Sequence, residues 1–362
     1  MNRKTNVKRY PFEPDYAVPP GRTLQETIDT LGMDQRDLAT RAGLSPKHIN
    51  QIINGIAPIT QETAIRLEQV TGVPARMWNN LEVSYREQLA KLEEKKRLEN
   101  DLTLLKKIPT AELMKRKVIE KHADPRELLK AVLGFFGVAD VDAWRRIWLS
   151  PSVAYRKSSV FCGKPEAMAT WLRLGEVEAR VVPCLPFDRT KFRAVLEEVR
   201  GLTVEQPEDF VPKMKALCMG AGVVVVLVPE IKNVPVSGAT RWLTSEKAMI
   251  QLSLRYRTND QFWFTFFHEA GHILLGGKKE AFIDLDHEKG EAETVADRFA
   301  ANLLIPPGKA SELSKLQSAQ AVKSFAGSIG IAPGIVVGRL QHDKIIGYDQ
   351  LNGLKVRFQW VK

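Results

Sequence analysis

The chain of 362 residues is longer than one small domain requires and can bury roughly two or three separate cores. A hydrophobic content of 44% with 27% charged residues is typical of a folded globular protein and excludes a disordered chain. The formal net charge of +10 is compatible with a polyanionic partner, and the three isolated cysteines provide neither a disulfide framework nor a paired-cysteine zinc site.

The sequence carries no signal for secretion or for a membrane span. The basic segment from Met1 to Tyr10 lacks the apolar core that follows the positive start of a signal peptide. The longest apolar run, from Ala221 to Pro229, is far too short to cross a bilayer, and its β-branched valines predict a buried strand. We therefore expect a cytoplasmic protein without membrane contact, which the isolated cysteines also favour.

Residues 1–20 are expected to form an irregular arm, after which the pattern becomes helical. Capping residues at the starts and glycines at the ends delimit short helices. A longer, increasingly charged helix follows Pro74 and stops before Pro109. The short helices are predicted from Thr23 to Gly32, from Asp34 to Gly43, from Ser45 to Gly55 and from Thr60 to Gly72.

The second and third of these helices, joined by the tight turn "GLS", are typical of a DNA-binding helix-turn-helix. In this motif the later helix lies in the major groove while the earlier helix braces it across the backbone. Ile49, Ile52 and Ile53 are predicted to face the core, which leaves polar side chains for phosphates and base edges. The alternative is a small helical bundle whose polar face is merely solvated. The candidate DNA-contacting residues are Ser45, Lys47, His48, Asn50, Gln51 and Asn54.

The rest of the chain predicts helices followed by a small sheet and more helices, so the expected fold class is α+β. Three β-rich runs, "VVVVLVPEI", "GATRWLT" and "AMIQLSLRY", begin at Val223 and predict a small antiparallel sheet. Helices follow from Phe262 to about Ile305. The expected parts are the arm at 1–20, an all-α DNA-binding domain at 21–92, a helical linker at 93–200 and a C-terminal domain at 201–362.

The stretch "HEAGH" within the last helical region has the spacing of a metal-binding helix. Residues four apart lie on one face of a helix, so His268 and His272 can point at one ion while Glu269 sits beside it. In a zinc hydrolase the ion lowers the pKa of a bound water to about 7, and the glutamate takes its proton. The alternative is a buried helix that contains two histidines by accident.

A catalytic metal needs a third ligand, and the candidates downstream are His287, Glu293 and Asp297. Glu293 and Asp297 stand four residues apart on an amphipathic helix, whereas His287 lies in a polar segment. We therefore prefer Glu293 as the ligand, with Asp297 orienting a metal-bound histidine. Zinc is the metal expected for two imidazoles and one carboxylate with an open position, and manganese is the alternative.

Both halves of the chain resemble known families. "QRDLATRAGLSPKHINQIINGIAPIT" resembles the XRE-type helix-turn-helix, and the following "QETAIRLEQVTGVPARMWNNLEVSY" resembles its HigA antitoxin branch, so that residues 20–90 are covered. This resemblance implies binding to double-stranded operator DNA as a homodimer, with the long helix after Pro74 as a candidate dimer element. The alternative for that helix is a simple link between two domains.

The C-terminal stretches "IQLSLRYRTNDQFWFTFFHEAGHILLGG" and "EAETVADRFAANLLIPP" resemble the ImmA/IrrE family of metallopeptidases over about residues 200–305. The resemblance implies a zincin-like domain in which His268, His272 and Glu293 bind the metal and Glu269 is the general base. Asp297 stands where many relatives have asparagine, so its role rests on spacing alone.

The combination of a DNA reader and a metallopeptidase suggests three functions. The leading one is a zinc-dependent endopeptidase tethered to operator DNA that cleaves a protein regulator in stress, phage or toxin–antitoxin control. The second is an antitoxin-type repressor whose peptidase-like domain binds a partner or senses metal without significant turnover. The third is a metallopeptidase toxin that a partner antitoxin restrains.

Two further features of a peptidase are expected near the metal-binding helix. An edge strand, either "GATRWLT" or "KAMIQLS", could bind an extended peptide by adding it to the sheet, although either could equally be an ordinary structural strand. Tyr256 and Arg255 precede the motif in the chain and are candidates for stabilising the oxyanion.

Overall fold

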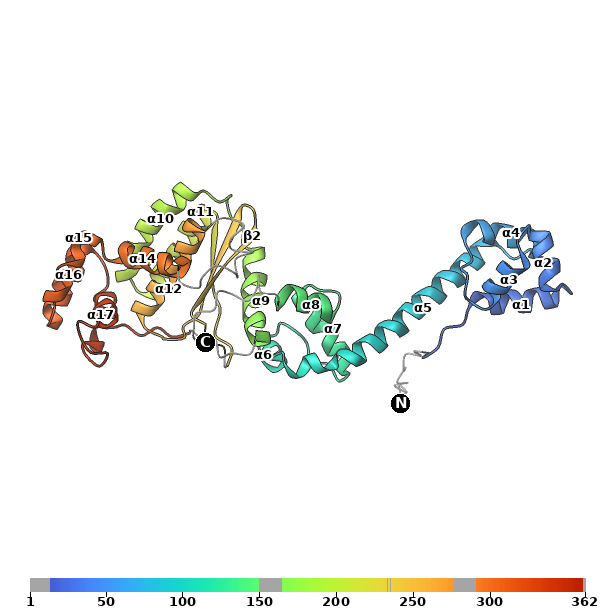
Figure 1. The fold of residues 1–362 in the computed structure, drawn as a ribbon, viewed down its shortest axis with the longest axis horizontal. Coiled ribbons are helices and arrows are strands. Elements are labelled where there is room, and N and C mark those ends of the chain that lie inside the picture. Colours follow the sequence, from blue (N-terminus) through green and yellow to red (C-terminus); the bar gives the residue numbers. More distant parts are fainter. Residues whose placement is uncertain (1–13, 150–164, 233, 235, 277–290, 361–362) are drawn as a thin grey trace, which may run out of the picture. The chain divides into compact units, whose positions relative to one another are not determined.

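The computed structural model describes residues 14–149, 165–232, 234, 236–276 and 291–360. The chain forms two compact units, Met1–Leu102 and Thr103–Lys362. Figure 1 shows the helices of the first unit in blue and cyan and the elements of the second unit from green to red. Each unit has its own hydrophobic core.

The N-terminal unit is entirely helical, as expected. Its caps are those that the sequence predicts, because Asp34 accepts hydrogen bonds from the backbone N–H groups of Arg36 and Asp37, and Ser45 accepts one from that of His48. Gly43 ends the second helix in the left-handed conformation with φ 64°. The helices are α1 (Pro20–Thr30), α2 (Gln35–Ala42), α3 (Pro46–Ile53), α4 (Gln61–Thr71) and α5 (Ala75–Asp101).

The core of this unit fixes the angle between α2 and α3. Leu38, Ile49, Ile52 and Trp78 are fully or almost fully buried in it. A Cβ on Gly21 of α1 would lie 2.3 Å from the backbone oxygen of Ile52, so only glycine allows α1 and α3 to pack this closely. The helix-turn-helix arrangement is therefore a consequence of packing and of capping together.

The C-terminal unit contains a three-stranded sheet with helices on both faces. The strands are β1 (Val223–Leu227), β2 (Gly238–Thr244) and β3 (Lys247–Leu252), in the order β1-β3-β2. β2 and β3 pair antiparallel, as expected. β1 pairs parallel with β3, with Val225 beside Ile250, so the sheet is mixed rather than antiparallel throughout.

The tight turn between β2 and β3 makes these two strands a hairpin. β1 pairs with the far side of β3 and runs in the same direction as β3, because of the path that the chain takes between β1 and β2. β3 is thus the central strand and β2 lies at an edge. Of the two strands considered for peptide binding, β3 has no free edge, and only β2 is suitable.

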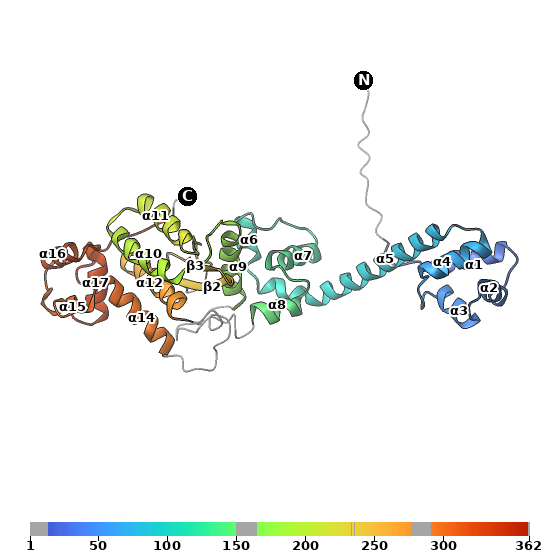
Figure 2. The same ribbon diagram turned by 90° about the horizontal axis from the view of Figure 1, so that it is seen from above.

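Side chains alternate between the two faces of the sheet. Trp242 and Ile250 point into the main core with α10 (Arg189–Gly201) and α12 (Asn259–Leu275), while Arg241 and Gln251 point to α9 (Pro165–Val181). Figure 2 shows α9 and α12 on opposite sides of the sheet. Because both faces are covered, β1 is a continuous run of buried valines.

Further helices complete the C-terminal unit around this sheet. They are α6 (Thr110–Lys115), α7 (Pro125–Phe136), α8 (Val141–Trp148), α11 (Pro207–Gly220), α14 (Glu291–Leu304), α15 (Pro307–Ala310), α16 (Ala319–Ile329) and α17 (Pro333–His342). Within the described ranges, no individual helix has the length and apolar character of a bilayer span. The pair α16 and α17, bent by 112°, meets that criterion only when both helices are taken together, and only by length and composition.

Candidate metal centre

The helix α12 carries both histidines of the "HEAGH" stretch on one face. Its other side is apolar, and Trp263, Phe266 and Phe267 are completely buried in the core. This anchoring fixes the rotation of the helix, so that His268 and His272 project together from the partly exposed face, each with 16% of its side chain exposed.

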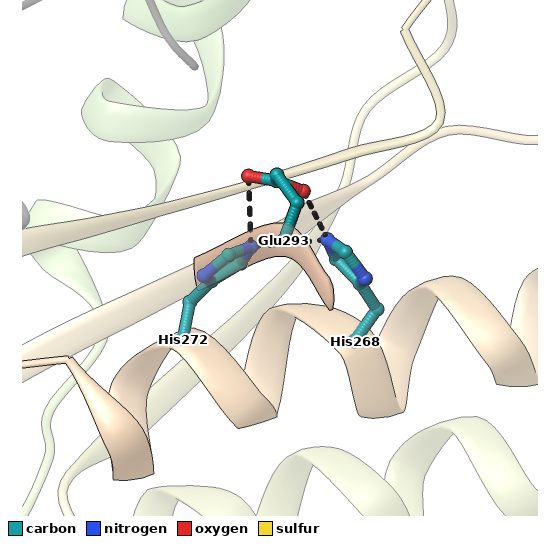
Figure 3. Close-up of side chains that lie close together, drawn as sticks. All are labelled: His268, His272 and Glu293. Atoms are coloured by element: carbon teal, nitrogen blue, oxygen red, sulfur yellow. Dashed lines mark hydrogen bonds and ion pairs between the residues drawn. The ribbon is translucent and has the colours of Figure 1, made fainter. Parts of the chain in front are cut away.

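Glu293 of α14 completes a cluster of three donor groups. Its Oε2 lies 3.1 Å from Nε2 of His268 and its Oε1 lies 3.4 Å from Nε2 of His272. Figure 3 shows the carboxylate bridging the two imidazole rings. The two Nε2 atoms are 3.0 Å apart, and the donor atoms of all three residues lie within 4.8 Å of one another.

The donor set fits a divalent metal ion. Neutral imidazoles present a lone pair on the nitrogen without a proton, so two Nε2 atoms at 3.0 Å need a proton or a cation between them. Two imidazoles and one carboxylate are a typical ligand set for catalytic zinc, with one position left for water or substrate. His268, His272 and Glu293 therefore fit the divalent metal ion that the spacing of the two histidines predicts.

Close packing of two helices brings Glu293 to the histidines. A Cβ on Gly271 would lie 3.1 Å from Cδ1 of Phe299 and 3.3 Å from Cα of Ala296, a tighter approach than side chains normally tolerate. Gly271 and the small Ala296 thus allow α12 and α14 to approach closely. As Glu293 stands one turn before Ala296, it reaches the metal-binding face of α12.

Asp297, one turn after Glu293, contacts the other side of the His268 ring. Its Oδ1 lies 2.7 Å from Nδ1 of His268, which directs Nε2 toward Glu293 and His272. Burial acts to lower the pKa of His268, but the hydrogen bonds to Asp297 and Glu293 outweigh burial and raise the pKa to about 10. For Glu293, burial acts to raise the pKa, and the hydrogen bonds to the two histidines bring it well below the usual range. In the metal-free protein the cluster thus holds a proton.

Glu269 lies beside this cluster in a buried position, with 8% of its surface exposed. The hydroxyl of Thr240 on β2 donates to its Oε2 at 2.8 Å. A Cβ on Gly238 would lie 2.9 Å from Cγ of Glu269, so glycine at this point lets β2 pass close to the carboxylate. The strand could be selected from sequence, but Thr240 and Gly238 could not, because no local pattern shows which strand residues face α12.

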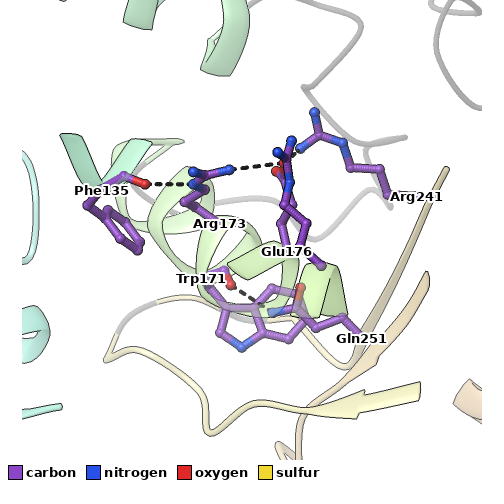
Figure 4. A network of polar contacts seen from close by, with 7 residues as sticks. Phe135, Trp171, Arg173, Glu176, Arg241 and Gln251 are labelled. Atoms are coloured by element: carbon purple, nitrogen blue, oxygen red, sulfur yellow. Dashed lines mark hydrogen bonds and ion pairs between the residues drawn. The ribbon is translucent and has the colours of Figure 1, made fainter. Parts of the chain in front are cut away.

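The strand that holds Thr240 is anchored from its other face. Arg241 of β2 forms an ion pair with Glu176 of α9 at 2.8 Å, and Arg173 contacts the same carboxylate at 3.0 Å (Figure 4). The side chain of Glu176 is only 3% exposed, so these pairs are little screened by water. Gln251 donates to the backbone oxygen of Trp171 at 2.7 Å and ties the central strand to the same helix. The edge strand is therefore held firmly next to Glu269.

The remaining residues selected from sequence have the following positions. Tyr256 and Arg255 line a cavity together with Thr265, one helical turn before His268. His287 lies outside the described residues.

The candidate DNA-contacting residues lie at or next to α3. Lys47 and Asn50 are exposed, whereas His48 and Gln51 are partly buried. Asn54 follows the helix as its C-cap and donates to the backbone oxygen of Asn50 at 2.8 Å. The candidates themselves are Ser45, Lys47, His48, Asn50, Gln51 and Asn54. Ile49 and Ile52 are buried as expected, but Ile53 is only partly buried because it lies at the end of the helix.

Comparison with known families assigns both regions. Residues 24–78 match the helix-turn-helix family, and residues 224–321 match the IrrE N-terminal-like domain of the M78 peptidase family. The second match contains the three donor residues and Glu269.

Similar proteins match the N-terminal unit. The chain is 35% identical over 63 residues to the uncharacterized HTH-type transcriptional regulator YddM of Escherichia coli, covering 17% of this chain and 67% of that protein. It is 34% identical over 70 residues to virulence-associated protein I of Dichelobacter nodosus, covering 19% of this chain and 65% of that protein. The chain thus spans about two thirds of the length of these curated relatives.

Solved structures match the same region. An addiction module antidote protein of the HigA family from Coxiella burnetii is 29% identical with a TM-score of 0.22, and the match covers 23% of this chain and 92% of that one. A protein described as a putative antidote protein of a plasmid maintenance system from Nostoc punctiforme is 30% identical with a TM-score of 0.23 and the same coverage. This chain belongs to the XRE-type helix-turn-helix regulators through its N-terminal unit, and its C-terminal unit carries an IrrE N-terminal-like domain of the M78 peptidase family.

Proposed function

We propose that this DNA-binding regulator is also a metal-dependent endopeptidase that cleaves a protein regulator. The observation that carries the proposal is the convergence of three metal-binding side chains from α12 and α14, with a buried glutamate next to them. A protein that only binds DNA or a partner has no need of Glu269, whereas a hydrolase requires a base at this place.

The metal would be held by His268, His272 and Glu293. A divalent ion bound there would act as a Lewis acid that activates water and polarises a carbonyl group. Zinc is the ion that best suits two imidazoles and one carboxylate, and manganese is the alternative. Asp297 would keep the proton of His268 on Nδ1, so that Nε2 is available as a ligand.

Glu269 would serve as the general base. The hydroxyl of Thr240 donates to one carboxylate oxygen of Glu269 and fixes the side chain. The carboxylate would therefore already be in position to accept the proton of the attacking water. The same carboxyl group would then give the proton to the leaving amine. The anchoring of β2 through Arg241 and Glu176 supports this placement.

The outer edge of β2 would bind the substrate in an extended conformation. In the described part of the chain the sheet ends at β2, so the edge is available to another strand. A peptide added there would pass Thr240, whose hydroxyl contacts Glu269, and its backbone would approach the metal centre. This mode of binding favours a flexible segment of a protein over a folded domain.

The N-terminal unit would bring this activity to operator DNA, with α3 in the major groove and the exposed Lys47 and Asn50 toward the duplex. We propose that the unit binds as a homodimer, as domains of this type read two half-sites. The regulator that is cleaved would then be a protein that acts at or near the same operator.

The first test measures bound metal and hydrolysis separately. Elemental mass spectrometry should find about one metal ion per chain in the wild type and in Glu269→Gln, and none in Glu293→Ala. The Glu291→Ala variant is the matched control, because it removes an exposed carboxylate from the same turn of α14.

Glu269→Gln should retain operator binding in a mobility-shift assay but should lose cleavage of co-expressed regulators. If its cellular phenotype equals that of the wild type, the endopeptidase proposal is wrong, and a repressor without turnover is the better account.

A further inference from the structure

The positive charge of the chain is concentrated just after the DNA-binding unit. Residues 1–102 contain fifteen Lys and Arg side chains against fourteen Asp and Glu, so this unit is almost neutral. Residues 103–149, at the start of the second unit, contain ten basic and six acidic side chains. Residues 150–164 add three basic side chains and no acidic one to the sequence. Most of the net charge of +10 therefore belongs to the segment that follows the DNA-binding unit.

Three exposed lysines lie at the end of α6 and in the turn that follows it, within the stretch "KRKVIEK". Within the described residues, none of the three forms an ion pair. Glu112 is paired with Arg116 at 2.8 Å, so Glu120 is the one carboxylate near the lysines along the chain that has no such pair. We call these three lysines the basic turn, which consists of Lys115, Lys117 and Lys121.

The basic turn is held in a defined conformation. The backbone N–H of Lys117 donates to the carbonyl oxygen of Met114 at 2.9 Å and closes the end of α6. The helix is anchored by Leu113, which is completely buried. The guanidinium of Arg116 donates to the backbone oxygen of Pro229 at 3.0 Å and ties the turn to the loop after β1. The lysines thus project from a fixed part of the second unit.

The backbone of Lys117 has a conformation that glycine adopts more easily. Its φ of 59° lies in the left-handed region, in which Gly43 ends α2 and Gly137 ends α7. A residue with a Cβ is less stable than glycine in this region. The fold would therefore be at least as stable with glycine at position 117, and the ammonium group is the part of Lys117 that the turn does not require.

Duplex DNA is the polyanion that fits this surface. Sequence-independent affinity for DNA depends on the number of lysines and arginines that neutralise phosphates, and an almost neutral N-terminal unit provides little net attraction. Residues 115–121 span at most about 20 Å, and one DNA strand carries a phosphate for about every 3.4 Å of rise, so each lysine of the basic turn has phosphates within its range. The turn also begins only thirteen residues after Leu102, where the DNA-binding unit ends.

We propose that the basic turn binds the phosphate backbone of the DNA that the N-terminal unit recognises. This contact is independent of base sequence and adds to the affinity that α3 provides. It gives the protein a second DNA-binding surface outside the helix-turn-helix. The inference goes beyond the proposed peptidase function and does not depend on it, because no residue of the metal centre takes part.

Binding of labelled DNA by the full-length protein tests the proposal. The probe is a fluorescein-labelled duplex of about 40 base pairs with mixed sequence, and its anisotropy gives the binding constant K at salt concentrations from about 50 to 200 mM. Each lost phosphate contact reduces the slope of log K against log salt by about 0.9. The combined variant Lys115→Gln, Lys117→Gln and Lys121→Gln should therefore lose roughly 2 to 3 units of slope and at least about tenfold in affinity at 100 mM salt.

Lys117→Gly separates the charge from folding. It should reduce the slope by about 0.9 without lowering the melting temperature, because glycine favours the conformation at this position. Lys344→Gly is the matched control, because the exposed Lys344 follows the end of α17 with the same φ of 59° and lies in the same unit. It should leave the slope unchanged. The control for the combined variant replaces three exposed lysines of the same unit by glutamine, namely Lys315, Lys323 and Lys344.

Four results would overturn the proposal. They are failure of the wild type to bind the duplex at about 50 mM salt, an unchanged slope in Lys117→Gly, an unchanged slope in the combined variant, and an equal loss of slope in the matched controls. Labelled poly-glutamate tests an acidic protein as the partner instead. If the combined variant loses poly-glutamate binding but keeps the wild-type slope on DNA, the basic turn serves such a protein and the proposal is wrong.

These measurements are independent of the peptidase proposal. Metal content and cleavage by the Glu269→Gln protein decide that proposal, whereas the DNA titrations involve neither. The combined variant of the basic turn should bind the same amount of metal as the wild type.

Discussion

Replacing Asp297 by alanine tests whether a residue that does not itself bind the metal increases the metal affinity of the site through His268. Its Oδ1 lies 2.7 Å from Nδ1 of His268. Loss of such a partner usually costs 10- to 100-fold in metal affinity. Since 58% of the Asp297 side chain is exposed, water screens part of the interaction. We therefore expect a loss of metal affinity at the lower end of this range, about tenfold or roughly 1.4 kcal/mol.

The size of this effect should depend on pH. Burial acts to lower the pKa of His268, but Asp297 and Glu293 together raise it to about 10 in the metal-free protein. A proton therefore competes with the metal below that pH. Removing Asp297 weakens the binding of the proton as well as that of the metal, so the loss of apparent affinity should be smaller at pH 7 than at pH 9.

Competition with a chromogenic chelator at both pH values provides the measurement. Asp297→Asn keeps an oxygen that can accept from Nδ1–H and should stay within roughly threefold of the wild type. Glu291→Ala removes the same charge from the start of α14 and is the control for long-range electrostatics. If Asp297→Ala and Glu291→Ala have the same metal affinity at both pH values, the contact between Asp297 and His268 does not affect metal binding.

Three further predictions concern other parts of the molecule. Lys47→Ala should weaken DNA binding about equally on all sequences and reduce the salt dependence of log K by about one unit, whereas an unchanged slope would mean that Lys47 contacts no phosphate. The metal-free protein should lose stability as pH rises from about 6.5 toward 10, because the folded state raises the pKa of His268. Thermal melts in the presence of a chelator should show this decrease of stability with pH in the wild type and not in His268→Ala. Cys218, whose pKa is raised by burial, should react with iodoacetamide only after unfolding and later than the half-buried Cys184, as followed by peptide mass spectrometry.

The helix-turn-helix could be predicted from sequence because its signals act over a few residues. Asp34 and Ser45 satisfy backbone N–H groups two or three positions away, and Gly43 takes up the conformation that ends a helix. The isoleucines of α3 follow helical periodicity, so their burial could be predicted too, except for Ile53 at the helix end. The caps depend on no distant part of the chain, whereas the burial of the isoleucines also requires core residues such as Trp78.

The strands of the sheet could be predicted from sequence, but the way in which β1 pairs could not. Each strand was evident from its β-branched and alternating residues, and the hairpin of β2 and β3 follows from a short turn. The parallel pairing of β1 with β3 depends on the path of the segment between β1 and β2, which carries no local signal. As a result the sequence left two candidate strands for a peptide, and only the strand order eliminated β3.

One part of the metal centre could be predicted from local sequence spacing, and the other part depends on tertiary packing. The spacing of His268 and His272 on one helix determined by itself that two imidazoles share a face, because helical geometry relates residues four apart. Tertiary structure decided the rest: the close approach of α12 and α14 at Gly271 brings Glu293 within 3.4 Å of both histidines, and the edge strand delivers Thr240 to Glu269. These contacts join residues that are 21 to 29 positions apart, and only packing of the core fixes which of them meet.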